Sequence, residues 1–144
     1  MDQAPSAAIL YPSFAMFALV AFVFVRMGRL RFGAVRSGQM NPAFYRTYDA
    51  GEEPEALRVV TRHFLNLFEV PVLFHVVLLM AYVTHHGGWW MVTLAWAYVA
   101  LRLAHTREHL GRNDVLARFR LYLASGVVLS LIWASLFLAL VFAG

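Results

Sequence analysis

Two histidines and a glutamate in the stretch AHTREHLGR, residues 104–112, have the spacing of a zinc-protease motif. His105, Glu108 and His109 form H-x-x-E-H, in which the histidines would bind zinc and the glutamate would act as a base. Such a site needs a further ligand downstream, yet the only acidic residue after Glu108 is Asp114. Glu108 also lies off the helix face that the histidines share, so we expect it to face solvent. We therefore predict no metal site, although haem ligation by histidines remains an alternative.

Other polar residues recur at helical spacing and predict a shared cavity. They form one stripe in residues 58–69, a second in residues 102–112, and a short third stripe near residue 120. Residues three, four, seven, eight or eleven positions apart share a helix face. Glu69 stands inside an apolar stretch, where a carboxylate must face the protein interior or water. The stripes comprise Arg58, Arg62, Asn66 and Glu69; Arg102, His105, His109 and Arg112; and Arg118 with Tyr122.

The composition places this chemistry in a membrane. The 144 residues are 61% hydrophobic and 14% charged, against about 45–50% and about 25% in soluble domains. The sequence contains no cysteine, so any thiol must come from a substrate, and it contains no lysine, which disfavours Schiff-base chemistry. With so much of the chain in lipid, we interpret the net charge of +4 as membrane topology and predict no nucleic-acid binding.

Four apolar stretches predict four transmembrane helices in one domain, residues 1–144. They run from about Ile9 to Val25, Phe64 to Thr84, Trp89 to Leu103, and Leu121 to Phe142. Seven arginines lie between Arg26 and Arg62, four follow the third stretch, and none lies in the turn at residues 85–88. The positive-inside rule then predicts cytoplasmic arginine-rich loops and both termini outside the cytoplasm.

The helices are expected to continue beyond the apolar stretches. Acidic residues and Pro54 predict a helix that begins near Glu53 and continues into the second stretch. The third helix is expected to end at Gly111, and Asn113 or Asp114 to cap the fourth. Arg118 then lies about one turn into the fourth helix.

Several of these segments, in order along the chain, resemble those of the MAPEG family, membrane-associated proteins in eicosanoid and glutathione metabolism. LRLAHTREHLGR resembles the third helix of the prostaglandin E synthase branch, and TRHFLNLFEVP resembles the family's second-helix pattern of arginine, asparagine and glutamate. GRLR resembles the basic end of its first helix. His109 stands where that branch has a tyrosine near the thiol, and Phe119 where it has a serine.

The resemblance implies an all-α integral membrane protein: a homotrimer of four-helix bundles, here a bacterial member in the inner membrane. Glutathione, as co-substrate, would bind in a cytoplasmic-side cleft between subunits. Arg118 would stabilise its thiolate beside His109. Arg29 would come from the adjacent subunit, and Arg62 and Arg102 would support the site. The remaining positions that match glutathione contacts are Asn66, Glu69, His105 and Tyr122.

Three functions remain open at this stage. We expect a glutathione-dependent transferase or peroxidase that acts on lipophilic electrophiles or lipid hydroperoxides. The alternatives are a non-catalytic membrane protein with the same fold, and a metal or haem protein. For the polar stripes the structural alternative is a salt-bridge network around Glu69. For His63 and His75 it is a packing role in the core or at an interface.

Overall fold

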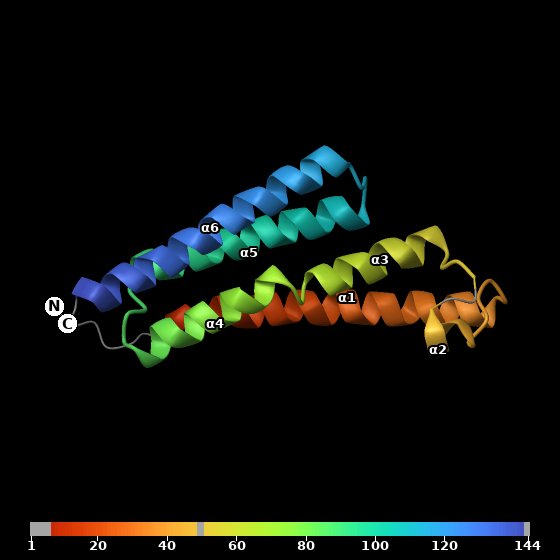
Figure 1. Cartoon of the computed structure of the whole chain (residues 1–144), viewed down its shortest axis with the longest axis horizontal. Helices are drawn as coiled ribbons and strands as arrows, with labels where there is room; N and C mark the ends of the chain where they lie inside the picture. The colour runs from red at the N-terminus through yellow and green to blue at the C-terminus, as the bar shows by residue number, and fades with distance from the viewer. Residues whose placement is uncertain (1–6, 49–50, 143–144) are drawn as a thin grey trace.

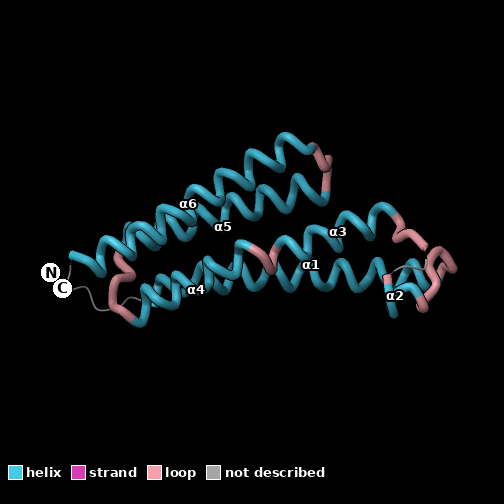
Figure 2. Tube along the Cα trace, in the orientation of Figure 1, coloured by secondary structure: helices cyan, strands magenta, loops and turns pink. Residues whose placement is uncertain are grey.

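The computed structural model describes residues 7–48 and 51–142, and this part of the chain is helical without a β-strand. The predicted all-α class is therefore confirmed, and Figure 2 shows helices joined by short connections. The elements are η1 (Ala7–Leu10), α1 (Tyr11–Arg36), α2 (Phe44–Thr47), α3 (Glu55–Asn66), α4 (Val70–Val83), α5 (Trp89–Leu110) and α6 (Val115–Phe142).

The long helices run alongside one another in two pairs (Figure 1). α5 and α6 form one antiparallel hairpin, and α1 packs against α3. The start of α1, the α4–α5 turn and the end of α6 lie at one end of the molecule. The opposite end carries the α1–α3 connection and the α5–α6 turn, and we call it the arginine-rich end.

The second apolar stretch is not the continuous helix expected from Glu53 onward. Its helix begins at Glu55, ends at Asn66 and resumes at Val70 as α4. Pro71, in the first turn of α4, explains the break. Proline has no N–H to donate to the carbonyl four residues earlier, and its ring clashes with that carbonyl. The break therefore falls at residues 67–69, beside the polar pair Asn66 and Glu69.

Three segments among the described residues are long and apolar enough to cross a membrane. They are Ala7–Arg36, Glu55–Val83 and Val115–Phe142. The first is longer than the predicted Ile9–Val25 because α1 continues to Arg36. α5, the predicted third span, does not meet the same criterion. It carries buried polar residues, among them Arg102, His105 and His109, which lower its hydropathy.

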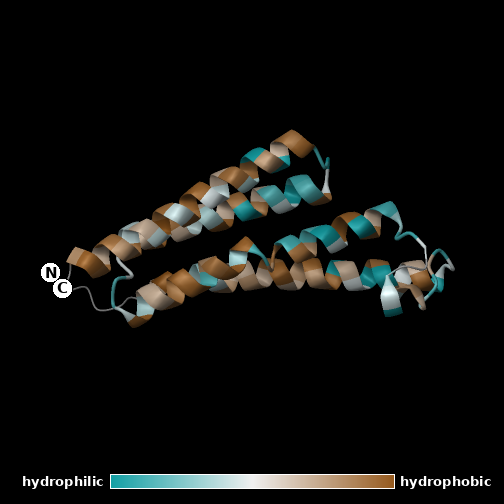
Figure 3. Cartoon of the chain, viewed as in Figure 1, coloured by the Kyte–Doolittle hydropathy of each residue, from teal (hydrophilic) through white to brown (hydrophobic). Residues whose placement is uncertain are grey.

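The outer surface of these helices is strongly apolar. Large side chains such as Phe14, Phe17, Leu79 and Phe137 are each more than half exposed. Figure 3 shows hydrophobic residues along most of the helix length and hydrophilic residues gathered toward the arginine-rich end. An apolar surface of this extent is stable in lipid and not in water. The chain is therefore an integral membrane protein.

The α5–α6 turn is short and determined by local interactions. α5 ends at Leu110, and a Cβ on Gly111 would lie 2.7 Å from the carbonyl oxygen of Arg107, so glycine is required there. Asp114 caps α6, because its Oδ1 accepts the backbone N–H of Ala117 at 2.6 Å. Asn113 instead adopts a left-handed conformation with φ of 57°. This turn holds the first residues of α6 close to the end of α5.

Candidate functional site

A polar cavity lies between α3, α5 and α6 at the arginine-rich end. Its volume is about 370 Å³. Six of the nine residues predicted for the site line it, together with the apolar residues Val115 and Phe119. The six are Arg62, Asn66, His105, His109, Arg118 and Tyr122. Residues from three helices, up to 60 positions apart, thus meet in one cavity.

Arg102 lies beside this cavity as a fully buried cation. Its Nη2 donates a 2.7 Å hydrogen bond to Asn66 Oδ1, and its guanidinium carbon is 5.7 Å from the centre of the Tyr122 ring. Asn66 Nδ2 in turn donates to Glu69 Oε2 at 3.4 Å. A chain of contacts therefore joins α5 to the α3–α4 break. The arginine is buried because Asn66 and Tyr122 surround it with acceptor and ring.

Three histidine rings contact one another at the interface of α3 and α5. The ring centre of His63 lies 4.7 Å from that of His109 and 5.5 Å from that of His105. His63 is fully buried, and its Nε2 is 2.9 Å from Thr106 Oγ1, which donates to the Arg102 carbonyl. The expected packing role of His63 fits this position, although its Nδ1 has no partner.

The described residues include no group of three or more histidine, cysteine, aspartate or glutamate side chains that could hold a metal ion. Glu108 is half-buried, which differs from the solvent-facing position expected. Its Oε1 accepts the backbone N–H of Asp114 at 3.2 Å. The glutamate of the H-x-x-E-H pattern therefore stabilises the α5–α6 turn.

Arg118 enters the cavity from the second turn of α6. It is half-buried, and its Nη1 donates a hydrogen bond to Asn113 Oδ1. The left-handed backbone of Asn113 directs this amide toward the helix that follows it. The sequence predicts only a helix-capping role for Asn113. The sequence does contain a signal for this second role. Asn113 comes two residues after the glycine that ends α5, and asparagine often adopts a left-handed backbone.

Several buried polar atoms around the cavity have no hydrogen-bond partner within the chain. A buried donor or acceptor left unpaired costs about 1–3 kcal/mol. Such atoms need a partner from outside the chain, such as ordered water or a polar ligand. The atoms are Arg102 Nε and Nη1, and the Nδ1 atoms of His63, His105 and His109, with the Tyr98 hydroxyl nearby on α5.

Three predicted residues lie outside the cavity lining of this single chain: Arg102, which is buried beside the cavity, Arg29 and Glu69. Arg29 is exposed on α1, and Glu69 is exposed beside the α3–α4 break. Glu69 still contacts the site through Asn66. His85 and His86 lie in the α4–α5 turn, as expected, at the end opposite the cavity.

The family model for MAPEG matches residues 9–138, which is most of the chain. The chain belongs to the MAPEG family. No curated protein and no solved structure matches it. Membership places this membrane protein in a family of glutathione and eicosanoid metabolism, whose members generally use glutathione.

Proposed function

We propose that this MAPEG protein is a glutathione-dependent transferase or peroxidase for lipophilic electrophiles or lipid hydroperoxides. The observation that carries the proposal is the cavity in which Arg62, Asn66, Arg118 and Tyr122 face the histidines of α5. Glutathione has two carboxylates, an amino group and a thiol. The cavity and its surroundings offer guanidinium groups for the carboxylates and a carboxylate, Glu69, for the amine.

The buried guanidinium of Arg102 supports a carboxylate ligand. Two of its nitrogen atoms, Nε and Nη1, are buried without a partner, while Nη2 is occupied by Asn66. Arginine remains charged and presents a planar fork that matches a carboxylate. Asn66 would hold the guanidinium in place through Nη2, and Nε and Nη1 would remain available to the ligand. Arg62, exposed at the cavity, would bind the second carboxylate.

Arg118 would activate the thiol. A thiol has a pKa near 8.5, and a neighbouring cation favours the thiolate, which is the nucleophile. In conjugation the thiolate sulfur would form a bond to an electrophilic carbon, and the leaving group would depart with its electron pair. His109, close to Arg118 in the cavity, would hold the position that a tyrosine occupies in the prostaglandin synthase branch.

The wider assembly follows from the same proposal. α5, 22 residues long and paired with α6, would also cross the membrane, as the third of four spans, with a length of about 33 Å. Three copies would form a homotrimer in which Arg29 of one subunit approaches the cavity of the next. The arginine-rich end would face the cytoplasm, with both termini outside, in a bacterial inner membrane.

The decisive experiment compares Arg118→Ala with Arg120→Ala, two residues further along α6 and exposed outside the cavity. Calorimetry measures glutathione binding, thiolate absorbance against pH measures the pKa of the bound thiol, and single-turnover kinetics measure conjugation to a model electrophile. Arg118→Ala should bind glutathione, raise the thiol pKa and slow conjugation by about 10²–10³, as expected for loss of one preorganised charge contact. Arg120→Ala should resemble the wild type.

The outcomes separate catalysis from binding. Arg118→Lys retains the positive charge but loses the planar guanidinium. A rate well above that of Arg118→Ala would indicate that the charge activates the thiol, and a rate as low as that of Arg118→Ala would indicate that the guanidinium geometry is required. An unchanged thiol pKa and rate in Arg118→Ala would refute the activation role and favour a non-catalytic protein that binds glutathione. No glutathione binding by the wild type would refute the whole proposal.

A further inference from the structure

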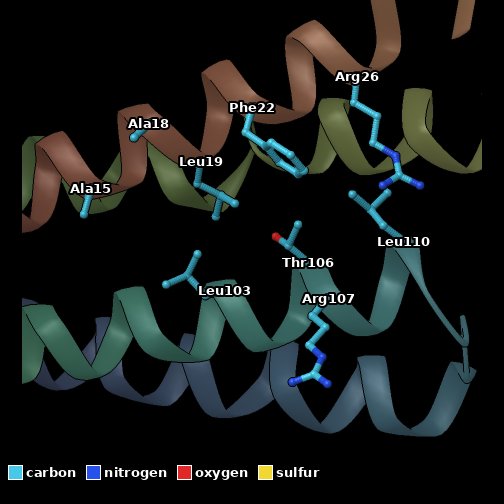
Figure 4. Close-up of a pocket in the computed structure, with 9 residues that line it drawn as sticks. All are labelled: Ala15, Ala18, Leu19, Phe22, Arg26, Leu103, Thr106, Arg107 and Leu110. Carbon is cyan, nitrogen blue, oxygen red and sulfur yellow. The ribbon is translucent and has the colours of Figure 1, made fainter. Parts of the chain in front are cut away.

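A second groove runs between α1 and α5, outside the candidate glutathione site. Its volume is about 550 Å³, and Figure 4 shows α1 on one side and α5 on the other. None of the nine predicted site residues contributes to it. The lining residues are Ala15, Ala18, Leu19, Phe22 and Arg26 on α1, and Leu103, Thr106, Arg107 and Leu110 on α5.

The groove is apolar along its length and cationic at one end. Its lining contains two arginines and no acidic residue. Arg26 extends from α1 toward Leu110, whereas the side chain of Arg107 extends from α5 away from α1 (Figure 4). Phe22 and Leu103 are 55% and 50% exposed, so the groove opens at the surface of the chain. The small side chains of Ala15 and Ala18 leave space between the helices.

The length of the groove matches one leaflet of a bilayer. Ala15 and Arg26 stand eleven residues apart on α1, which corresponds to about 16 Å of helix. The hydrocarbon core of a bilayer is about 30 Å thick, so one leaflet contributes about 15 Å. Arg26 is also the first charged residue after the apolar part of α1. The Arg26 guanidinium therefore lies at the depth of the lipid headgroups.

We propose that this groove binds an anionic phospholipid of the surrounding bilayer. One acyl chain lies between α1 and α5 along Ala15, Ala18 and Leu19, and the phosphate lies against Arg26, with the side chain of Arg107 turning toward it when the lipid binds. Arginine binds phosphate through paired N–H groups, and each basic residue near an anionic lipid surface contributes about 1 kcal/mol. The lipid also joins α1 to α5 at the end where α1 and the α5–α6 hairpin diverge (Figure 1).

The test uses the full chain, purified in detergent and stripped of lipid. Phosphatidylglycerol, phosphatidylcholine and soluble glycerol phosphate are added separately, and binding is followed by native mass spectrometry and thermal unfolding. Phosphatidylglycerol should bind most tightly, and glycerol phosphate should not bind, because the acyl chain is needed. Arg26→Gln with Arg107→Gln should reduce the preference for phosphatidylglycerol over phosphatidylcholine by about thirtyfold, since each arginine accounts for about fivefold. Arg36→Gln, at the exposed end of α1, is the matched control and should keep the preference.

A second variant tests whether the lipid must enter the groove or whether surface charge alone retains it. Ala18→Trp fills the space between the helices and should abolish retention of both lipids without changing glutathione binding. Equal binding of the two lipids by the wild type would overturn the proposal. So would full preference in the double arginine variant, or normal lipid retention in Ala18→Trp. Cross-links from Ala18→Cys to a neighbouring copy would show that protein covers the groove and would also overturn it.

Discussion

Arg118 is held by the turn that precedes its own helix. Asn113 accepts a hydrogen bond from the guanidinium, and its backbone has a positive φ of 57°. Few residues satisfy both requirements, because the left-handed region disfavours most side chains and the amide oxygen must reach the arginine. The proposed activating cation thus depends on a residue that need not touch glutathione.

Replacing Asn113 by glycine should separate positioning from folding. Glycine adopts the same positive φ without strain but loses the amide oxygen. A hydrogen bond to a charged group contributes about 1.5–3 kcal/mol. We expect Asn113→Gly to slow conjugation by about tenfold or more and to raise the pKa of the bound thiol, with little change in the unfolding midpoint. Arg112→Ala in the same turn is the control, and an equal loss there would indicate general damage to the turn.

Helical spacing in the sequence predicts most of the residues that line the cavity. Asn66, His105, Arg118 and Tyr122 lie on faces that a 3.6-residue period defines, so their convergence could be predicted from sequence. The role of Asn113 could not be predicted from sequence, because it depends on the backbone conformation of a turn. The half-buried position of Glu108 was also missed, because the N–H that it accepts lies beyond the end of its helix.

At the scale of elements, the break between α3 and α4 changes the second polar stripe. A face argument treats Asn66 and Glu69 as members of one continuous helix. The structure instead places residues 67–69 in a turn, since Pro71 interrupts the hydrogen-bond ladder. The proline was visible in the sequence, but its effect falls several residues upstream. The break directs Glu69 toward Asn66 and leaves its other side exposed.

Pro71→Ala should test whether this break serves the site. Alanine restores the missing N–H and lets the helix continue through residues 67–70. We expect weaker glutathione binding, by about tenfold, because a continued helix would shift Glu69 and the start of α4 relative to the rest of the cavity. Pro12→Ala is the control, since Pro12 also lies in the first turn of a helix but far from the cavity. Unchanged binding, measured by calorimetry, would mean that the break has only a packing role.

At the scale of the whole molecule, one chain leaves polar groups exposed on an apolar surface. Arg29 and Glu69 are both exposed in the single chain. An ionisable group at the depth of a membrane-spanning segment needs protein or water around it. In the proposed homotrimer, a neighbouring subunit would cover Arg29 and Glu69. The number of copies cannot be derived from a single sequence, because symmetry belongs to the contact between chains.

A mixed assembly tests the shared site directly. Co-expressed Arg29→Ala and Arg118→Ala subunits are each defective alone. If Arg29 acts on the cavity of an adjacent subunit, random mixing should rebuild about a quarter of the sites, which is detectable as recovered conjugation. Native mass spectrometry should show three copies of the 16.3 kDa chain. A monomer, or no recovery after confirmed mixing, would contradict the intersubunit arrangement.

The number of membrane crossings depends on α5. α5 has lower hydropathy than the other long helices because its buried face carries Arg102, His105 and His109. Burial among α1, α3 and α6 removes that face from lipid, so the helix can span despite its polarity. If it does, the turns before and after α5 lie on opposite sides of the membrane. The absence of native cysteine makes this testable with single substitutions.

Gly88→Cys reports the first turn and Arg112→Cys the second, and both positions are exposed. A Cβ on Gly88 meets no atom within 4 Å, so the fold should tolerate the change. Intact cells treated with a membrane-impermeant maleimide should label Gly88→Cys, whereas Arg112→Cys should react only after lysis, as the arginine distribution predicts. The reverse pattern would invert the topology. Labelling of both residues from one side would show that α5 returns to the same face, and the four-span bundle would be wrong.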